Sequence, residues 1–108
     1  MENDMLNELV LGILRSLREQ PVRIVLYGST ARGTNTDESD IDIAVFVRAR
    51  FDAEEDELLS DVIVDLNLKY GKVFSVIDID ESIYQKWRSV TPFYQNVDRD
   101  GVVLWKAA

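Results

Sequence analysis

Two aspartates in one short run of the chain, Asp40 and Asp42, are the residues best suited to chemistry. From Asp40 onward, apolar residues alternate with other side chains, which predicts a strand over 40–47 with both aspartates on one face. Same-face neighbours have Cα atoms roughly 6.6 Å apart, so both carboxylates can converge on a divalent cation. Mg²⁺ held by carboxylates and substrate phosphates is typical of phosphoryl and nucleotidyl transfer. We therefore predict that Asp40 and Asp42 bind Mg²⁺ or Mn²⁺, with two solvated surface acids as the alternative.

A turn suited to phosphate binding precedes the aspartates. A short β-rich run over 23–27 stops at Gly28-Ser29, and the next three residues can begin a helical turn. Free backbone N–H groups at that helix start, the Ser29 hydroxyl and the Arg32 guanidinium would together bind phosphate oxygens. The alternatives are a turn that only reverses the chain and a surface arginine paired with an acid.

The composition restricts the chemistry to carboxylates. The 108 residues include no Cys and no His, which excludes thiolate and imidazole catalysis, zinc held by those groups, and disulfides. Twelve basic and twenty acidic residues give a net charge of −8 and a pI near 4.4, which disfavours nucleic acid as a partner. The first residues lack a basic leader segment, and no run reaches the roughly 18 apolar residues of a membrane span. We therefore expect a cytoplasmic protein without membrane association.

Two long helices are predicted from apolar residues at helical spacing. The first runs from Met5 and ends before Pro21. The second begins at residues 52–57, whose start resembles a capping box, and ends at Gly71. The acids of 52–57 suit the positive end of a helix dipole, so we interpret them as a helix start rather than a metal cluster. One ion pair at a spacing of four residues is predicted on this helix: Asp65 with Lys69.

Short β-rich runs predict the remaining elements. Besides 23–27 and 40–47, strands are expected at 73–77 and 101–105, and a helix at 81–87 that Pro92 prevents from continuing. The chain contains no repeat, linker or low-complexity tract. The sequence therefore predicts a single domain over residues 1–108, of the α/β (α+β) class, with a mixed β-sheet and helices packed on one face.

The turn and the aspartates together form a longer motif. Gly28-Ser29-Thr30-Ala31-Arg32-Gly33, six further residues and Asp40-Ile41-Asp42 closely resemble the Gly-Ser…Asp-x-Asp signature of the polymerase-β-like nucleotidyltransferase superfamily. Over essentially its full length, the chain resembles the minimal nucleotidyltransferases within that superfamily. The resemblance implies the nucleotidyltransferase fold, with Gly28, Ser29 and Arg32 at the phosphates of ATP or another NTP. It also implies that Asp40 and Asp42 bind two metal ions while a nucleoside monophosphate, expected to be AMP, passes to an acceptor hydroxyl.

The sequence departs from the superfamily at a third carboxylate. Members usually carry this acid on the next core strand, where it helps to bind a metal and activates the acceptor hydroxyl. The equivalent position is Ser75, and the nearest acid is Asp78, which alternation places on the opposite face unless the strand contains a bulge. Asp78 is therefore a candidate catalytic residue, with a strand-end or helix-capping role as the alternative. A domain with weak or absent catalysis, acting by binding alone, is the second functional interpretation.

The resemblance also implies a protein partner. Minimal nucleotidyltransferases often pair with helical proteins of the HEPN type and act as antitoxins, by binding the toxic partner or by adenylylating it. A stripe of apolar and aromatic residues at helical spacing near the C-terminus could contact such a partner or pack in the core, and core packing is favoured. Its members are Ile83, Trp87, Val90, Tyr94 and Val97. Small-molecule hydroxyl acceptors and association between copies of the chain stay open.

Overall fold

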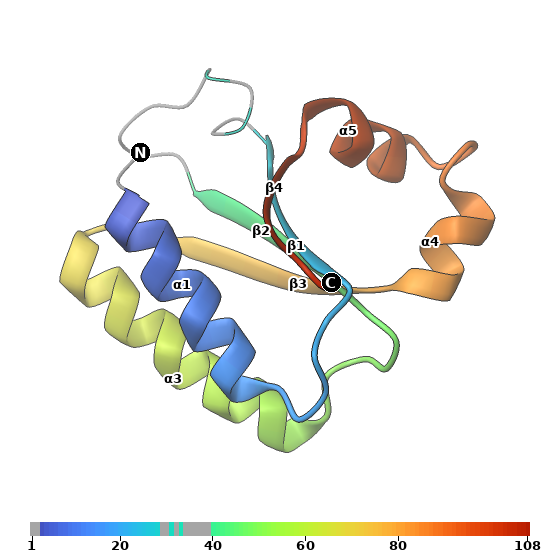
Figure 1. The fold of residues 1–108 in the computed structure, drawn as a ribbon. Coiled ribbons are helices and arrows are strands. Elements are labelled where there is room, and N and C mark those ends of the chain that lie inside the picture. Colours follow the sequence, from blue (N-terminus) through green and yellow to red (C-terminus); the bar gives the residue numbers. More distant parts are fainter. Residues whose placement is uncertain (1–2, 29–30, 32, 34–39) are drawn as a thin grey trace.

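A four-stranded sheet with helices on both faces makes up the protein (Figure 1). The computed structural model describes residues 3–28, 31, 33 and 40–108. In chain order the elements are α1 (Asn3–Ser16), β1 (Arg23–Tyr27), β2 (Ile41–Val47), α3 (Ala53–Tyr70), β3 (Phe74–Asp80), α4 (Glu81–Trp87), α5 (Pro92–Asp100) and β4 (Val102–Lys106). The α/β (α+β) class and the mixed sheet predicted from the sequence are confirmed, as are the four strands, although β3 is three residues longer at its end than expected. The sequence predicts helices on one face, and the structure differs in that α4 and α5 lie on the second face.

The sheet is mixed, with strand order β3-β2-β1-β4. The central strand β2 pairs with β1 in antiparallel orientation and with β3 in parallel orientation, and β4 runs antiparallel to β1. The end of β1 therefore lies beside the starts of β2 and β3. Residues from three separate parts of the sequence meet at this one end of the sheet.

The two long helices pack together on one face of the sheet (Figure 1). The strand residues under them are the apolar set that alternation predicts for β2, together with residues of β1 and β3: Ile24, Leu26, Ile41, Ile43, Val45, Val47 and Phe74. Burying each such side chain contributes about 1.5–3 kcal/mol, so this layer is the main source of stability. The prediction of helices over this face is confirmed.

The start and end of α3 follow the sequence signals. Asp52 accepts a hydrogen bond from the backbone N–H of Glu55, whose side chain accepts one from the backbone N–H of Asp52, which completes the capping box. Gly71 ends the helix in the left-handed conformation, with φ of 63°. The predicted ion pair within α3 is wrong, because Lys69 reaches across to α1 and bonds Glu8 at 2.7 Å.

The two short helices, α4 and α5, cover part of the other face. Phe46 of β2 and Tyr84 of α4 pack edge to face, with ring centroids 4.8 Å apart. The Arg23 guanidinium lies 3.8 Å from the centre of the Phe46 ring and pairs with Glu81 at 3.1 Å, which attaches the start of α4 to β1. Phe46 and Asp42 are an even number of residues apart on β2, so Asp42 lies on the same face of the sheet as these contacts.

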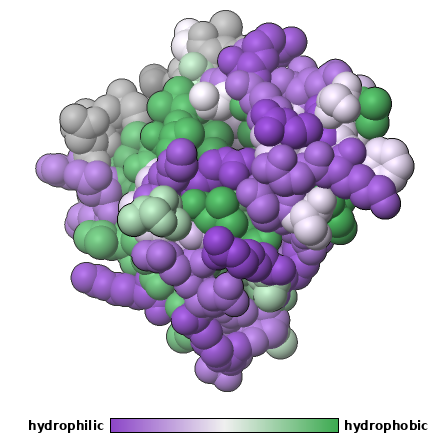
Figure 2. All heavy atoms as spheres, turned by 45° about the vertical axis from the view of Figure 1, so that its right-hand side comes forward, coloured by the Kyte–Doolittle hydropathy of each residue, from purple (hydrophilic) through white to green (hydrophobic). Residues whose placement is uncertain are grey.

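The C-terminal stripe predicted from the sequence divides between core and surface. Val97 is buried and Tyr94 is half-buried against Tyr84, whereas the other three residues are exposed: Ile83, Trp87 and Val90. Figure 2, in which the side bearing α4 and α5 comes forward, shows small hydrophobic areas on a largely hydrophilic surface. The described part of the chain contains no helix long and apolar enough to cross a bilayer.

Candidate active site at the shared strand end

Asp42 lies at the centre of the sheet end where three strands meet. Its neighbours in register are Tyr27 on β1 and Ser75 on β3, and paired residues share a face. Tyr27 packs against the cluster under α4 and α5 and contacts Phe93 of α5, so this is the face that those helices cover in part. Asp40 is exposed and lies one residue before the start of β2, two residues before Asp42.

Gly28 packs directly against the Asp42 carboxylate. Its φ is +77°, a conformation that residues with a side chain rarely adopt. A Cβ atom at this position would lie 2.5 Å from Oδ2 of Asp42, well inside van der Waals contact. Two independent constraints therefore require glycine here, and the second shows that the backbone at Gly28 lies beside the carboxylate.

The negative charge of Asp42 also acts on Tyr27. Burial, and then the nearby Asp42 carboxylate, raise the pKa of the Tyr27 phenol above its ordinary value. The phenol is protonated near neutral pH, as an unshifted tyrosine also is, and its O–H can donate a hydrogen bond. Two other predicted site residues, Ser29 and Arg32, lie outside the described residues.

The register of β3 separates Ser75 from Asp78. Ser75 lies beside Asp42, as the alignment with the superfamily strand predicts, and the pairing continues without a bulge from residue 74 to 80. Asp78 is paired with Val45, whose side chain belongs to the core under α1 and α3, so Asp78 is on the opposite face from Asp42. The structure therefore does not bring Asp78 to the site.

Asp78 instead holds the loop that leads into α3. Its carboxylate accepts hydrogen bonds from Nε of Arg50 at 2.6 Å and from the backbone N–H of Phe51 at 2.9 Å. Burial raises the pKa of the Asp78 carboxyl, but these hydrogen bonds outweigh it, and the net effect lowers the pKa. The alternation of strand side chains predicts that Ser75 and Asp78 lie on opposite faces, because the two positions are an odd number of residues apart.

A small pocket next to Gly28 was missed from the sequence. It has a volume of about 170 Å³ and lies between the end of β1 and α5. Its lining is Tyr27, Gly28, Phe93, Asn96, Val97 and Asp100. Tyr27 shares the face of Asp42 through the register of β1 with β2, which the sequence did not specify. No local sequence signal indicates that α5 lines this pocket, because the position of α5 depends on the path of the chain after β3.

Comparisons with known proteins establish the family of the chain. The family model described as "Nucleotidyltransferase domain" matches residues 8–96. The chain belongs to this family. Two proteins of Methanocaldococcus jannaschii, each named a putative protein adenylyltransferase, are 35% and 29% identical to this nucleotidyltransferase domain. The first match covers 96% of this chain and 98% of the relative, and the second covers 92% and 94%.

Solved structures share the fold of this nucleotidyltransferase domain. A toxin-antitoxin structure with AMP-PNP contains a chain that is 25% identical, with a TM-score of 0.63. The match covers 94% of this domain and 73% of that chain. A tri-AMPylated Shewanella oneidensis HEPN toxin in complex with MNT antitoxin also has a TM-score of 0.63, at 20% identity and with 99% and 74% coverage.

The donor set of the site suits a hard cation that shares its ligands with a substrate. Asp40 and Asp42 are carboxylates, the oxygen ligands that such cations prefer, and Gly28 packs against the second of them. Within the described ranges, no group of three or more acidic side chains could hold a metal by itself. Mg²⁺ commonly keeps one or two protein carboxylates and takes its other ligands from phosphates and water, which fits this arrangement.

Proposed function

We propose that the protein is a Mg²⁺- or Mn²⁺-dependent nucleotidyltransferase that moves AMP from ATP onto an acceptor hydroxyl. The observation that carries this proposal is the contact between Gly28 and Asp42, which joins the phosphate-binding turn to the metal-binding strand. A relative named as a protein adenylyltransferase, matched along nearly its whole length, supports ATP as donor and a protein as acceptor.

The chemistry is an in-line substitution at the α-phosphorus. The acceptor oxygen forms a bond to that phosphorus, the bond to the bridging oxygen of the β-phosphate breaks and pyrophosphate leaves, while the proton of the acceptor hydroxyl passes to water. Asp40 and Asp42 would hold the divalent cation, which when bound would supply positive charge to the attacking and leaving oxygens. The Gly28 turn would orient the phosphates, with Ser29 and Arg32 proposed as further ligands of their oxygens.

The acceptor that we propose is a hydroxyl of a helical HEPN-type partner, so that the protein acts as an antitoxin. Structures of a tri-AMPylated HEPN toxin with its MNT antitoxin, and of a toxin-antitoxin with AMP-PNP, support this assignment. Both match this chain over at least 94% of its length. A small-molecule hydroxyl is the alternative acceptor.

One observation favours a second function. Ser75 lies beside Asp42, where the superfamily usually has a third carboxylate, and a serine supplies no anionic ligand or strong base. A domain that neutralises a helical partner by contact, with slow or absent transfer, is therefore the alternative proposal.

The test is co-expression with a HEPN-type partner, followed by intact-mass measurement of that partner. We expect a mass increase of one or more AMP groups with the wild-type chain and none with Asp42→Asn. Asp61→Asn is the matched control, because it makes the same chemical change at an exposed position of α3. An unmodified partner that still forms a stable complex with the wild-type chain would support the binding function instead.

A further inference from the structure

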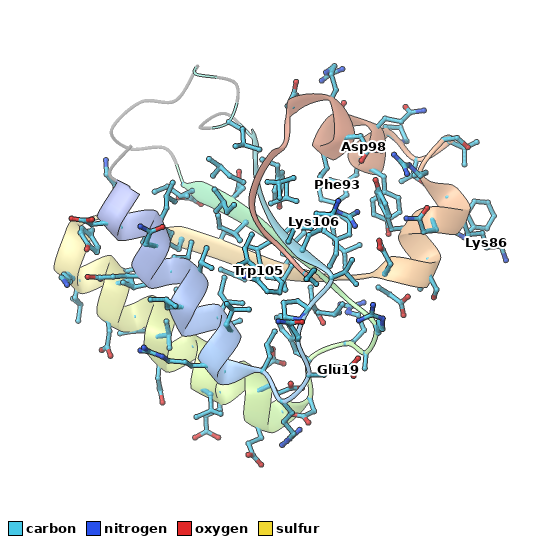
Figure 3. The ribbon with its side chains drawn as sticks, viewed as in Figure 1. Glu19, Lys86, Phe93, Asp98, Trp105 and Lys106 are labelled. Carbon is cyan, nitrogen blue, oxygen red and sulfur yellow. The ribbon has the colours of Figure 1, made fainter. Side chains whose placement is uncertain are left out.

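The pocket beside Gly28 has a partly aromatic lining. Phe93 and Tyr27 form two of its walls, with ring centroids 5.6 Å apart and planes at 90°. Phe93 is 38% exposed, so part of its ring remains available to a ligand. Figure 3 shows Phe93 between α5 and the strands. The volume of about 170 Å³ is below the 300–1,000 Å³ of a site for a whole drug-sized ligand, so one ring system is the portion that fits.

The charges of the lining exclude phosphate as the occupant. None of the residues that line the pocket in the described part of the chain is a lysine or an arginine, and one is the acid Asp100. Asp100 is already engaged, since its carboxylate accepts two hydrogen bonds from Arg99 at 3.1 and 3.0 Å. The polar chemistry available to a ligand therefore comes mainly from the neighbouring amide.

Asn96 supplies that amide. It is exposed, it stands one helical turn after Phe93, and its side chain makes no hydrogen bond to any other described residue. An asparagine amide offers a donor and an acceptor side by side, the pattern that matches the amino group and adjacent ring nitrogen of adenine. Aromatic side chains stack on bases of every kind, so the ring supplies affinity and the amide supplies selectivity.

From this juxtaposition we infer that the pocket binds the adenine ring of the nucleotide, with Phe93 as the stacking surface and Asn96 as the residue that selects adenine. The inference rests on the proposed function, because the phosphates must lie at Gly28 and Asp42. Gly28 lines the pocket and also touches Asp42, so one bound nucleotide spans both places. Asn96 and Phe93 are thus specificity determinants rather than catalytic residues.

The experiment measures binding by calorimetry with Mg²⁺ and three ligands: ATP, purine riboside triphosphate, which lacks the adenine amino group, and inorganic tripolyphosphate. Phe93→Leu keeps an apolar side chain but removes the aromatic face, and should weaken ATP binding roughly tenfold. Asn96→Ala should reduce the preference for ATP over purine riboside triphosphate by about three- to tenfold. Neither change should alter the affinity for tripolyphosphate. Asn7→Ala, at an exposed amide on α1, is the matched control.

The outcomes separate the two proposals. If ATP and tripolyphosphate bind the wild-type chain and Asp42→Asn loses both, while the Phe93 and Asn96 variants bind ATP as wild type does, the adenine pocket is wrong and the proposed function stands. The adenine pocket is also wrong if, in a transfer assay, the Phe93 and Asn96 variants change the KM of the acceptor but not that of ATP. If neither ligand binds the wild-type chain, both proposals fail.

Discussion

Substituting Gly28 by alanine tests whether the turn must touch Asp42. The new methyl group would start 2.5 Å from Oδ2 of Asp42, so the carboxylate has to rotate away from its present position. The backbone would also hold a non-glycine residue at φ of +77°, which costs about 1–2 kcal/mol. For a domain of this size, each kcal/mol lowers Tm by roughly 4–8 °C. We therefore expect a modestly destabilised fold that has lost Mg²⁺-dependent ATP binding.

Gly71→Ala is the matched control for the backbone effect. Gly71 has a φ of +63°, and a Cβ atom there meets nothing within 4 Å. Its thermal denaturation should show a similar loss of stability, while calorimetry of Mg²⁺ and ATP should give the wild-type affinity. The reasoning is refuted if Gly28→Ala binds Mg²⁺ and ATP as tightly as Gly71→Ala does, since Asp42 would then not need the space beside this glycine.

Three further predictions concern the third carboxylate position, the loop before α3 and the exposed surface of α4. Ser75→Asp restores the carboxylate beside Asp42 and should raise the rate of AMP transfer at least tenfold, measured with radiolabelled ATP; an unchanged rate would show that the serine does not limit catalysis. Asp78→Asn should leave ATP affinity unchanged and destabilise the fold by about 1 kcal/mol at pH 7, a small value because Arg50 is exposed. Because folding lowers the Asp78 pKa, its contribution is present above the unfolded value near 3.8 and disappears as the pH falls through the folded value, so urea denaturation of the two proteins should converge in acid. The double variant Ile83→Ala/Trp87→Ala should weaken partner binding with little change in Tm, because both side chains are exposed. Tyr94→Ala should lower Tm, because Tyr94 packs against the core. If the double variant lowers Tm but leaves partner binding unchanged, this surface is not a docking site.

The sequence predicts the elements well where the signals are local. The apolar spacing of α1 and the capping box at Asp52 involve residues within one or two turns of each other, so periodicity and capping chemistry are sufficient. The same holds for β2, whose alternation places its apolar residues on the face under α1 and α3 and Asp42 on the other face. Lys69 shows the limit of such local signals, because it pairs with Glu8 on α1 and not with the nearest acid along its own helix.

The arrangement around Asp42 depends on contacts between distant parts of the chain. The strand register that puts Tyr27 and Ser75 on either side of it comes from packing of three strands. The return of α5 to Gly28 follows from the lengths of β3 and α4, which local signals do not specify to within a residue. Phe93 and Asn96 therefore could not be assigned to a pocket before the fold was known.

Thermal denaturation with each of ATP, GTP, CTP and UTP, with and without Mg²⁺, tests the central claim most directly, because a ligand of the native state must stabilise it. The account predicts a saturable, Mg²⁺-dependent rise in Tm that is largest with ATP and absent in Asp42→Asn. No rise with any nucleotide at millimolar concentration, or the same rise in Asp42→Asn, would contradict it.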